Sequence, residues 1–479
     1  MSSEKFNVTE HAVPGCHIRE YPGSTVHQED ILKLHVKQYT PKNQAEPVPA
    51  DAITIIAAHG AALPKELYEP LWDELLNQAT GFHIRSIWVA DCASMNTSGV
   101  LNEDKLSMDC IHLVFQMMPI PKTNHLFSTR RLLDGSCAGP VPDDQPFPRA
   151  DAPSTRRNRP QHGRQHHVCA SIDFSTQQQR ALTIPFSTNL AFLHPRLFTT
   201  ILLVDPVIQL SPPAMGFGTD PPGAANYTLR RSDVWPSREA AVQANRKFMH
   251  GWDPRCVELM ADHGFRDLPT RLYPDVEAVK AKFGTSTNNN NNTTTPVTLT
   301  TTKHHDLLGQ IRQNFSARNP TTGVIEIPRD FHADLDPVAA FIPLYRPEPR
   351  STFFRLPTLR PSCLWVVGGS TYLNLDEMRL AIKRCGTGVG GSGDLLEGRV
   401  KEVTLPGLGH LMPFQEVKAV VEPCAAWLRE EMERFRRVEQ EWEEAQKGKS
   451  HLVVEDNWYK VLKPVNARHG KVGRSAKLS

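Results

Sequence analysis

The sequence lacks the long apolar runs and the charge bias that mark several large classes of protein. Its 479 residues hold 54 Lys and Arg against 52 Asp and Glu, so neither the basic surface of a nucleic-acid-binding protein nor an acidic tail is expected. It contains no run of about 18 uninterrupted apolar residues, so we expect no transmembrane helix. The first residues also lack the apolar stretch of a secretory signal, which favours an intracellular protein.

Recognisable metal and nucleotide motifs are missing too. The nine cysteines are scattered and form no C-x-x-C pair, which argues against both a disulfide framework and a zinc site. The histidine-rich stretches around His166 and His304 have no third ligand at a suitable spacing. The glycine-rich run 386–393 lacks the lysine of a phosphate-binding loop. We therefore expect no metal and no cofactor.

What the sequence does contain is an alternation of apolar runs and amphipathic segments. Strand-like runs occupy residues 31–39, 53–58, 84–91, 199–206, 363–367 and 400–405. A helix with leucines on one face is predicted after Pro64, and a long charged helix from about 417 to 447. Strands that alternate with helices in this way predict an α/β fold around a mostly parallel sheet.

Residues 206–362 interrupt this alternation. They contain helical pieces and a run of five asparagines, 288–292, between threonine-rich arms. Such a polar low-complexity run cannot pack a core and is typical of a surface linker. We interpret the block as a cap inserted into the sheet domain.

The segment 128–188 does not fit this plan. Its 61 residues include eight Arg and seven Pro but no Lys, Glu, Tyr or Trp, and apolar periodicity is absent. A structureless loop of this length is unusual inside a compact domain. Three interpretations stay open: a disordered insertion, an unusual loop, or retained intron or out-of-frame sequence in the gene model. The composition favours the third.

Three features point to chemistry at the carboxyl edge of the predicted sheet. His410 follows the last strand in a Gly-x-Gly-His loop, where a general base would be held. Asp205 ends the run 201–204 and could orient His410, with Asp376 and Glu377 as rival carboxylates. The turn after residues 53–58 predicts backbone oxyanion donors at Gly60 and Ala61.

The nucleophile is not identified. Serine hydrolases of this layout carry Ser in G-x-S-x-G between a strand and a helix, and the sequence contains no such motif. The helix that ends at His194 places the expected turn near residues 180–184. The nearest match, Gly135-x-Cys137-x-Gly139, is followed by Pro140, so a thiol nucleophile at Cys137 is a weak alternative.

Several longer stretches resemble a known family. They are IREYPG (18–23), VKQYTP (36–41), PKELYEPLW (64–72), GVLNED (99–104), HPRLF (194–198) and GTGVGG (386–391). They are similar to the fungal α/β-hydrolases typified by the AK-toxin and AF-toxin biosynthesis hydrolases, over about residues 7–107 and 189–470. The resemblance implies an α/β-hydrolase fold with an inserted cap, a Ser–acid–His catalytic set, and a role in secondary metabolism or fatty-acyl chemistry. His410 matches the last-loop histidine of the family.

The resemblance gives a division of the chain into parts. Residues 1–107, 189–205 and 363–430 would form the hydrolase core, 206–362 the cap, and 431–479 a charged helix and tail. Residues 108–188 replace the region of the Gly-His-Ser-Met-Gly-like elbow of similar proteins, so the serine of the family cannot be assigned to any residue here.

Two hypotheses about function follow. The first is hydrolysis of a small-molecule acyl ester or thioester, impaired because the serine motif is missing. The second is an inactive scaffold that binds a small molecule or a partner. Family members imply a peroxisomal location, but Ala476-Lys477-Leu478 is followed by Ser479, so the location expected here is cytoplasmic or peroxisomal. The sequence does not predict the oligomeric state.

Overall fold

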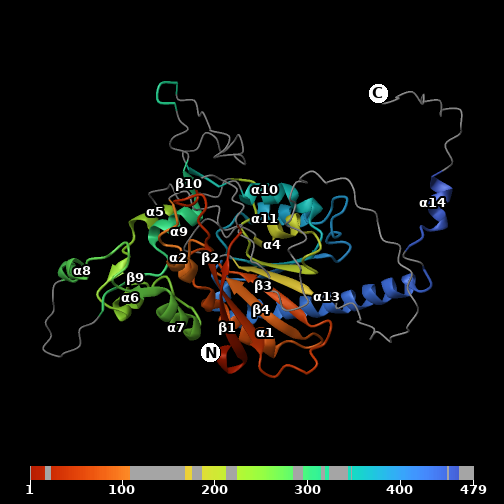
Figure 1. Cartoon of the computed structure of the whole chain (residues 1–479), viewed down its shortest axis with the longest axis horizontal. Coiled ribbons are helices and arrows are strands. Elements are labelled where there is room, and N and C mark those ends of the chain that lie inside the picture. Colours follow the sequence, from red (N-terminus) through yellow and green to blue (C-terminus); the bar gives the residue numbers. More distant parts are fainter. Residues whose placement is uncertain are drawn as a thin grey trace, which may run out of the picture. The chain divides into compact units, whose positions relative to one another are not determined.

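The computed structural model describes residues 2–16, 23–107, 168–174, 186–211, 224–283, 295–313, 319–322, 344–346, 348–449 and 452–462. The chain divides into two compact units, Met1–Glu431 and Met432–Ser479. The larger unit is built on an eight-stranded sheet with helices on both faces (Figure 1).

The sheet is antiparallel at one edge and parallel elsewhere. The first two strands pair antiparallel, β2 also pairs antiparallel with β4, and all later pairings are parallel. In spatial order the strands are β1 (Phe6–Pro14), β2 (Lys33–Pro41), β4 (Ile84–Ala90), β3 (Ile53–Ala58), β5 (Cys169–Phe174), β6 (Thr200–Val204), β12 (Ser362–Gly368) and β13 (Val400–Leu405). Because β3 to β13 run parallel, their carboxyl ends share one edge of the sheet.

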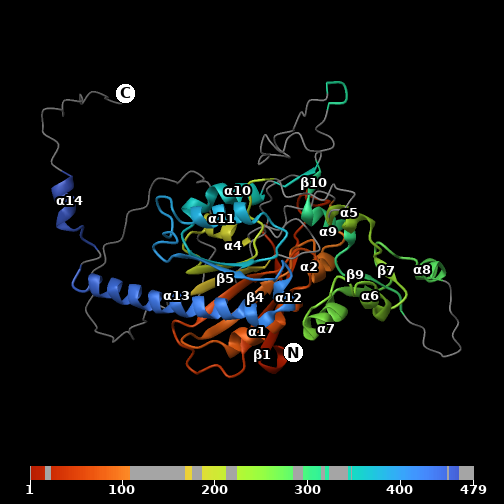
Figure 2. The same ribbon diagram turned by 180° about the vertical axis from the view of Figure 1, so that it is seen from behind.

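Helices cover the two faces of the sheet. One face carries α4 (Phe186–Leu193), α10 (Glu348–Arg355) and α11 (Leu375–Arg384), which enclose a buried apolar cluster around Trp365. On the opposite side, as Figures 1 and 2 show, lie α1 (Glu69–Asn77) and the start of α13 (Val417–Gln446). Trp427 of α13 donates from its indole to Thr200 of β6 at 2.8 Å.

The burial of the strands explains which of them the sequence predicts. All five residues of β6 are buried, and the uninterrupted apolar run from Ile201 to Val204 is typical of a parallel strand covered on both faces. The predictions of β2, β3, β4, β6, β12 and β13 are confirmed, and β3 has the predicted bounds. The edge strand β1 was not predicted, because its outer residues are polar and mostly exposed.

Strand β5 shows that the segment 128–188 contains regular structure, where the sequence predicted none. Residues Cys169–Phe174 of that segment form a strand between β3 and β6, in the middle of the sheet. Its sequence, CASIDF, alternates polar and apolar residues over only six positions inside an arginine- and proline-rich segment, which is too short a pattern to mark a strand clearly. Residues 168–173 are buried. Helix α4 begins at Phe186, so residues 186–188 of this segment also belong to the core, which the predicted division resumes at residue 189. Residues 108–167 and 175–185 lie outside the described part.

The block after β6 forms the cap. Its described elements are α5 (Ala224–Arg230), β7 (Val234–Trp235), α6 (Arg238–Ala244), α7 (Pro254–His263), β8 (Phe265–Asp267), α8 (Val276–Lys282), β9 (Val297–Leu299), α9 (Lys303–Gln310), β10 (Arg312–Gln313) and β11 (Leu344–Tyr345). Small sheets join β7, β9 and β8, and β10 with β11. The asparagine run lies outside the described residues.

The cap is tied to the sheet domain at several points. Asn96 begins helix α2 (Asn96–Leu101) after β4 and bonds to Thr301 of the cap, and Arg266 of β8 pairs with Glu103 at 2.5 Å. Helix α10, which the predicted division assigns to the cap, packs on α4 through a hydrogen bond from Asn189 to Thr352 at 2.9 Å. This helix therefore belongs structurally with the sheet.

The remaining described elements are short. They are η1 (Ser2–Glu4), η2 (Lys65–Tyr68), η5 (Leu356–Thr358), α12 (Met412–Gln415) and, in the second unit, α14 (Asp456–Val461). Across the described ranges, no helix combines the length and the apolar content needed to cross a bilayer.

Candidate active site

Asp205 stands at the carboxyl end of β6 in an unusual backbone conformation. Its φ is +49°, in the left-handed region that few residues other than glycine adopt. The turn brings its carboxylate under the end of the neighbouring strand β12. There Oδ1 accepts from the Gly368 N–H at 3.0 Å, and Oδ2 accepts from the Thr371 hydroxyl at 2.6 Å.

His410 completes this arrangement from the loop after β13. Its Nδ1 and the Asp205 Oδ2 form a hydrogen bond, and both side chains are fully buried. The ring of Tyr372 stands edge-on to the imidazole, with centroids 5.0 Å apart. The other ring nitrogen, Nε2, is buried and has no hydrogen-bond partner among the described residues.

This geometry suits general-base chemistry. With the proton on Nδ1 held by the Asp205 carboxylate, Nε2 presents a lone pair, and the carboxylate stabilises the imidazolium that forms when Nε2 takes a proton. A buried imidazole nitrogen without a partner would be costly in a purely structural role. The arrangement therefore fits the general-base role that the sequence predicts for His410.

The two rival carboxylates are engaged elsewhere. Glu377 accepts hydrogen bonds from the backbone N–H groups of Leu210 and Ser211 at 2.8 and 3.0 Å. Asp376 is exposed in the first turn of α11. Of the three candidates, Asp205 is the one that bonds to His410.

The loop after β3 holds the two predicted oxyanion donors. The Gly60 N–H already donates to the Tyr68 hydroxyl at 2.8 Å, so Gly60 is not available as a donor. The Ala62 N–H points to the Met95 sulfur at 3.1 Å, with φ of +55° at Ala62. The Ala61 N–H has no hydrogen bond within the described part of the chain. Ala61 is thus the remaining donor of the predicted pair.

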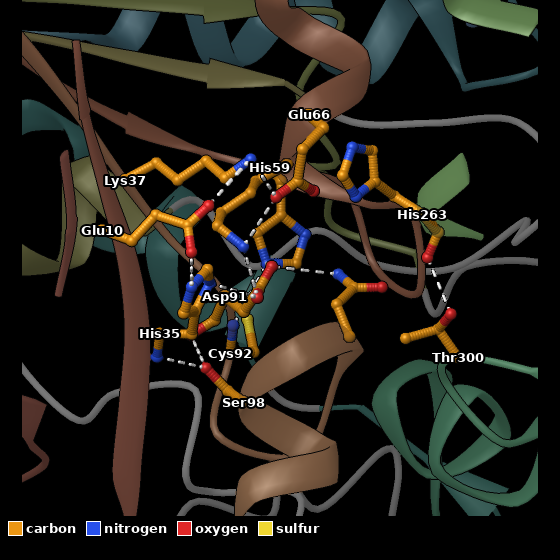
Figure 3. A network of polar contacts seen from close by, with 12 residues as sticks. Glu10, His35, Lys37, His59, Glu66, Asp91, Cys92, Ser98, His263 and Thr300 are labelled. Atoms are coloured by element: carbon orange, nitrogen blue, oxygen red, sulfur yellow. Dashed lines mark hydrogen bonds and ion pairs between the residues drawn. The ribbon is translucent and has the colours of Figure 1, made fainter. Parts of the chain in front are cut away.

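A buried network of charges underlies this loop (Figure 3). Lys65 and Asp91 form an ion pair of 2.7 Å with both side chains fully buried. Glu66 lies 3.1 Å from Lys65 and 3.2 Å from Lys37. Burial alone would raise the pKa of Asp91, but the Lys65 ammonium lowers it below its usual range. Asp91 and Glu66 likewise raise the pKa of Lys65 against the effect of burial.

The positions predicted for the nucleophile lie outside the described residues. They are residues 180–184, where the sequence placed the nucleophile turn, and Cys137. In the part that the structure describes, no group of three or more His, Cys, Asp or Glu is arranged to hold a metal ion. Of the second histidine-rich stretch, Asp306 pairs with Arg231 at 2.9 Å.

Sequence reasoning missed the residues that hold the dyad and the loop. Thr371 follows β12 by three positions, and the adjacency of β6 and β12 is the signal that could have placed it beside Asp205. Lys65 and Asp91 carried no such signal, because charged residues next to a helix and a strand end are usually solvated.

Comparisons with known proteins found relatives that match over the full length of the chain. No family model matches the chain. The chain is 62% identical over 478 residues to a Penicillium roqueforti protein named type I acyl-CoA thioesterase mpaH, with all of both chains covered. It is 60% identical over 478 residues to the type I acyl-CoA thioesterase mpaH′ of Penicillium brevicompactum, again with all of both chains covered.

More distant matches confirm the predicted resemblance and fold. The abhydrolase domain-containing protein AFT2-1 of Alternaria alternata is 24% identical over 235 residues, which are 49% of this chain and 74% of that protein. The peroxisomal α/β-hydrolase Lpx1 of Saccharomyces cerevisiae superposes with a TM-score of 0.53 at 14% identity, covering 94% of this chain and 99% of that one. This chain belongs to the α/β-hydrolase family of the Penicillium mpaH proteins.

Proposed function

We propose that this protein hydrolyses the thioester of an acyl-CoA in secondary metabolism. The observation that carries the proposal is the buried His410, whose Nδ1 bonds to Asp205 while Nε2 has no partner among the described residues. Relatives that match over the full length and are named acyl-CoA thioesterases support this choice of substrate over an oxygen ester.

The reaction divides into two steps with His410 in both. First, Nε2 takes the proton of the nucleophile as it attacks the thioester carbonyl, and the Ala61 N–H donates to the carbonyl oxygen as it becomes negative. The C–S bond then breaks, and the proton passes from His410 to the departing CoA sulfur. Second, His410 takes a proton from water as it attacks the acyl-enzyme, and then passes that proton to the nucleophile as its bond to the acyl carbon breaks, which releases the carboxylic acid and restores the free enzyme.

We infer that the nucleophile lies between β5 and α4. These elements end at Phe174 and begin at Phe186, and α/β-hydrolases carry the nucleophile between this strand and this helix. The connecting residues include Ser175, Thr176 and Thr183 as hydroxyl side chains. The comparisons give no support to the hypothesis of impaired activity, so we propose an active enzyme. The intracellular location stays a prediction.

The test is a thioesterase assay on the full chain. Purified protein would be given acyl-CoA esters of several chain lengths, and the released CoA thiol measured with a thiol reagent. Hydrolysis should be lost in His410→Ala and retained in His250→Ala, because the His250 side chain is exposed and has no part in the dyad.

Labelling identifies the missing residue in the same preparation. A fluorophosphonate probe should label the wild-type chain but not His410→Ala, and mass mapping would name the nucleophile. A protein that neither hydrolyses any acyl-CoA nor takes up the probe would instead be the inactive binding scaffold.

A further inference from the structure

The described non-glycine residues with a left-handed backbone are Ala62, Asn96 and Asp205. Asp205 orients His410, and Ala62 follows the candidate oxyanion donor Ala61. Asn96, with φ of +48°, is buried and lies in neither group. Strained backbone of this kind persists where surrounding contacts enforce it, often at functional sites. The contacts of Asn96 therefore require an explanation.

On the side of the sheet domain, Asn96 holds the oxyanion loop. Its side-chain amide donates to the Leu63 carbonyl at 2.9 Å and to the Asp91 carboxylate at 3.2 Å. Leu63 lies two residues after Ala61, and its own N–H closes a turn onto the Gly60 carbonyl at 3.3 Å. Asp91 is held in turn by the buried Lys65. Asn96 thus links the loop, at Leu63, to the buried Asp91 carboxylate.

On the side of the cap, Asn96 forms its described hydrogen bonds with one residue, Thr301. Its backbone N–H donates to the Thr301 hydroxyl at 2.8 Å, and that hydroxyl donates to the Asn96 Oδ1 at 2.9 Å. Thr301 lies between β9 and α9. Both partners are at least nine-tenths buried, so water does not replace these bonds freely.

Helix α9 also packs closely against the same loop, at Gly309. A Cβ added at Gly309 would lie 2.3 Å from the Met95 methyl carbon and 4.0 Å from the Cβ of Ala61. Met95 is the residue whose sulfur receives the Ala62 N–H. The cap therefore reaches the oxyanion loop through Thr301, by way of Asn96, and through the close packing at Gly309. The Cys256 thiol of α7 also donates to the Leu67 carbonyl at 3.5 Å, further along the loop.

We propose that Asn96 and Thr301 are positioning residues that couple the seating of the cap to the placement of the Ala61 N–H. The inference rests on the proposed function, since the Ala61 donor matters to rate only if an oxyanion forms. An oxyanion donor acts only when it stands about 2.7–3.1 Å from the developing negative charge. Loss of the Thr301 bonds should therefore lower the rate of the chemical step more than it weakens substrate binding.

Thr301→Val removes the hydroxyl and keeps the shape of the side chain. We expect kcat to fall about tenfold, which is the effect of displacing a donor without deleting it, while KM changes less than about twofold. Thr301→Ser keeps the hydroxyl and should restore kcat. Thr300→Val is the matched control, because the Thr300 hydroxyl bonds within the cap, to the His263 carbonyl at 2.7 Å, and should leave kcat unchanged.

A second measurement does not depend on turnover. Deuterium exchange of the peptide that spans residues 59–67 reports the opening of the oxyanion loop. Exchange should be several-fold faster in Thr301→Val than in wild type and unchanged in Thr300→Val, although both substitutions lie in the cap.

The outcomes separate the two proposals. If Thr301→Val leaves the exchange of 59–67 at the wild-type rate, or if Thr300→Val lowers kcat as much as Thr301→Val does, the coupling is overturned. If wild-type protein hydrolyses no acyl-CoA but Thr301→Val still accelerates exchange in the loop, the coupling stands and the proposed thioesterase function fails.

Discussion

Two aspartate–histidine pairs lie at the carboxyl edge of the same sheet, and they differ in what surrounds the imidazole. Asp205 bonds to His410 and receives two further neutral donors, Gly368 and Thr371, and the His410 Nε2 has no partner among the described residues. Asp91 lies 3.9 Å from His59 but is paired with the Lys65 ammonium. Asp205 is therefore bonded to a histidine, whereas Asp91 is bonded to a lysine.

The hydrogen bonds of His59 complete the contrast. Its Nδ1 donates to the Gly60 carbonyl at 2.7 Å, and its Nε2 accepts from the Cys92 N–H at 3.1 Å. Burial opposes the charged ring while Cys92 and Asp91 favour it, with a net rise in the pKa of His59 to about 9. A protonated Nε2 would face the Cys92 N–H donor to donor, however, so the geometry favours the neutral ring. Both nitrogens are engaged, as expected of a structural histidine.

The largest effect should come from removing the histidine that has a spare nitrogen. We expect His410→Ala to lower kcat/KM for acyl-CoA hydrolysis by about 10³-fold to 10⁴-fold, because both proton transfers of the reaction depend on Nε2. Steady-state kinetics would measure the loss, and a thermal unfolding curve would show whether the fold survives. A variant that kept more than about a tenth of the wild-type rate would exclude His410 as the base.

Breaking the ion pair between Lys65 and Asp91 should act chiefly on stability. Lys65→Met leaves the Asp91 carboxylate buried without its cation, which should lower the free energy of unfolding by about 3–5 kcal/mol. Urea unfolding would measure it. The double variant Lys65→Met/Asp91→Leu should recover part of the loss, since neither charge is then stranded. An equal loss in the single and double variants would mean that the ion pair itself is not the cause.

The pH dependence of this pair has a definite sign. Because Lys65 lowers the pKa of Asp91, the ionised carboxylate contributes stability that is complete above the ordinary carboxyl pKa. That contribution is lost as the pH falls toward the lowered value. In Lys65→Met, burial without the cation raises the pKa of Asp91, so this acid-side loss disappears and the stability gap between wild type and variant should narrow as the pH falls.

The contact between Asp205 and His410 could be predicted from the sequence, because it follows from the topology of the sheet. Asp205 ends one parallel strand and His410 follows the last one, and the carboxyl ends of such strands share an edge. The choice of Asp205 over Asp376 or Glu377 required the structure. It depends on the turn at Asp205, whose positive φ no sequence pattern announces.

The ion pair between Lys65 and Asp91 and its surroundings could not be predicted in this way. Lys65 begins a short helix, where charge is normally solvated, and its burial is set by tertiary contacts with Asp91 and Glu66. Asn96 and Thr301 are 205 positions apart in the chain, and nothing local pairs them. Strand β5 was missed because its polar–apolar alternation spans only six residues inside an arginine- and proline-rich segment.

Asp173, near the end of β5, is another buried carboxylate at this edge of the sheet, and among the described residues neither a histidine nor a lysine lies beside it. Burial raises its pKa to about 7, and the N–H and hydroxyl of Ser187 only partly oppose this rise. An acid with a raised folded-state pKa binds its proton more tightly in the native state. It therefore contributes stability below its unfolded pKa of about 4, and this contribution is lost as the pH rises through 7.

Asp173→Asn tests this reasoning. The amide can accept from the Ser187 N–H and donate to the Ser187 hydroxyl, and it cannot ionise. We expect the variant to be more stable than wild type at pH 8, by up to about 4 kcal/mol for a shift of this size, and to match it near pH 4. Chemical denaturation at the two pH values would measure the difference. The same stability gap at both pH values would mean that Asp173 does not titrate in this range.

The smallest effect should come from removing a hydrogen bond to the Asp205 carboxylate. Thr371→Val removes the 2.6 Å hydroxyl donor to Asp205 and leaves the Gly368 N–H in place. A carboxylate with one donor fewer holds the His410 Nδ1–H less rigidly, so we expect kcat to fall about tenfold, equal to about 1.4 kcal/mol. Thr371→Ser, which keeps the hydroxyl, should act as wild type. Because Thr371 touches the dyad and not the Lys65–Asp91 network, Thr371→Val should leave the deuterium exchange of residues 59–67 unchanged. An acceleration there would show that the two aspartate centres are one coupled unit and not two independent ones.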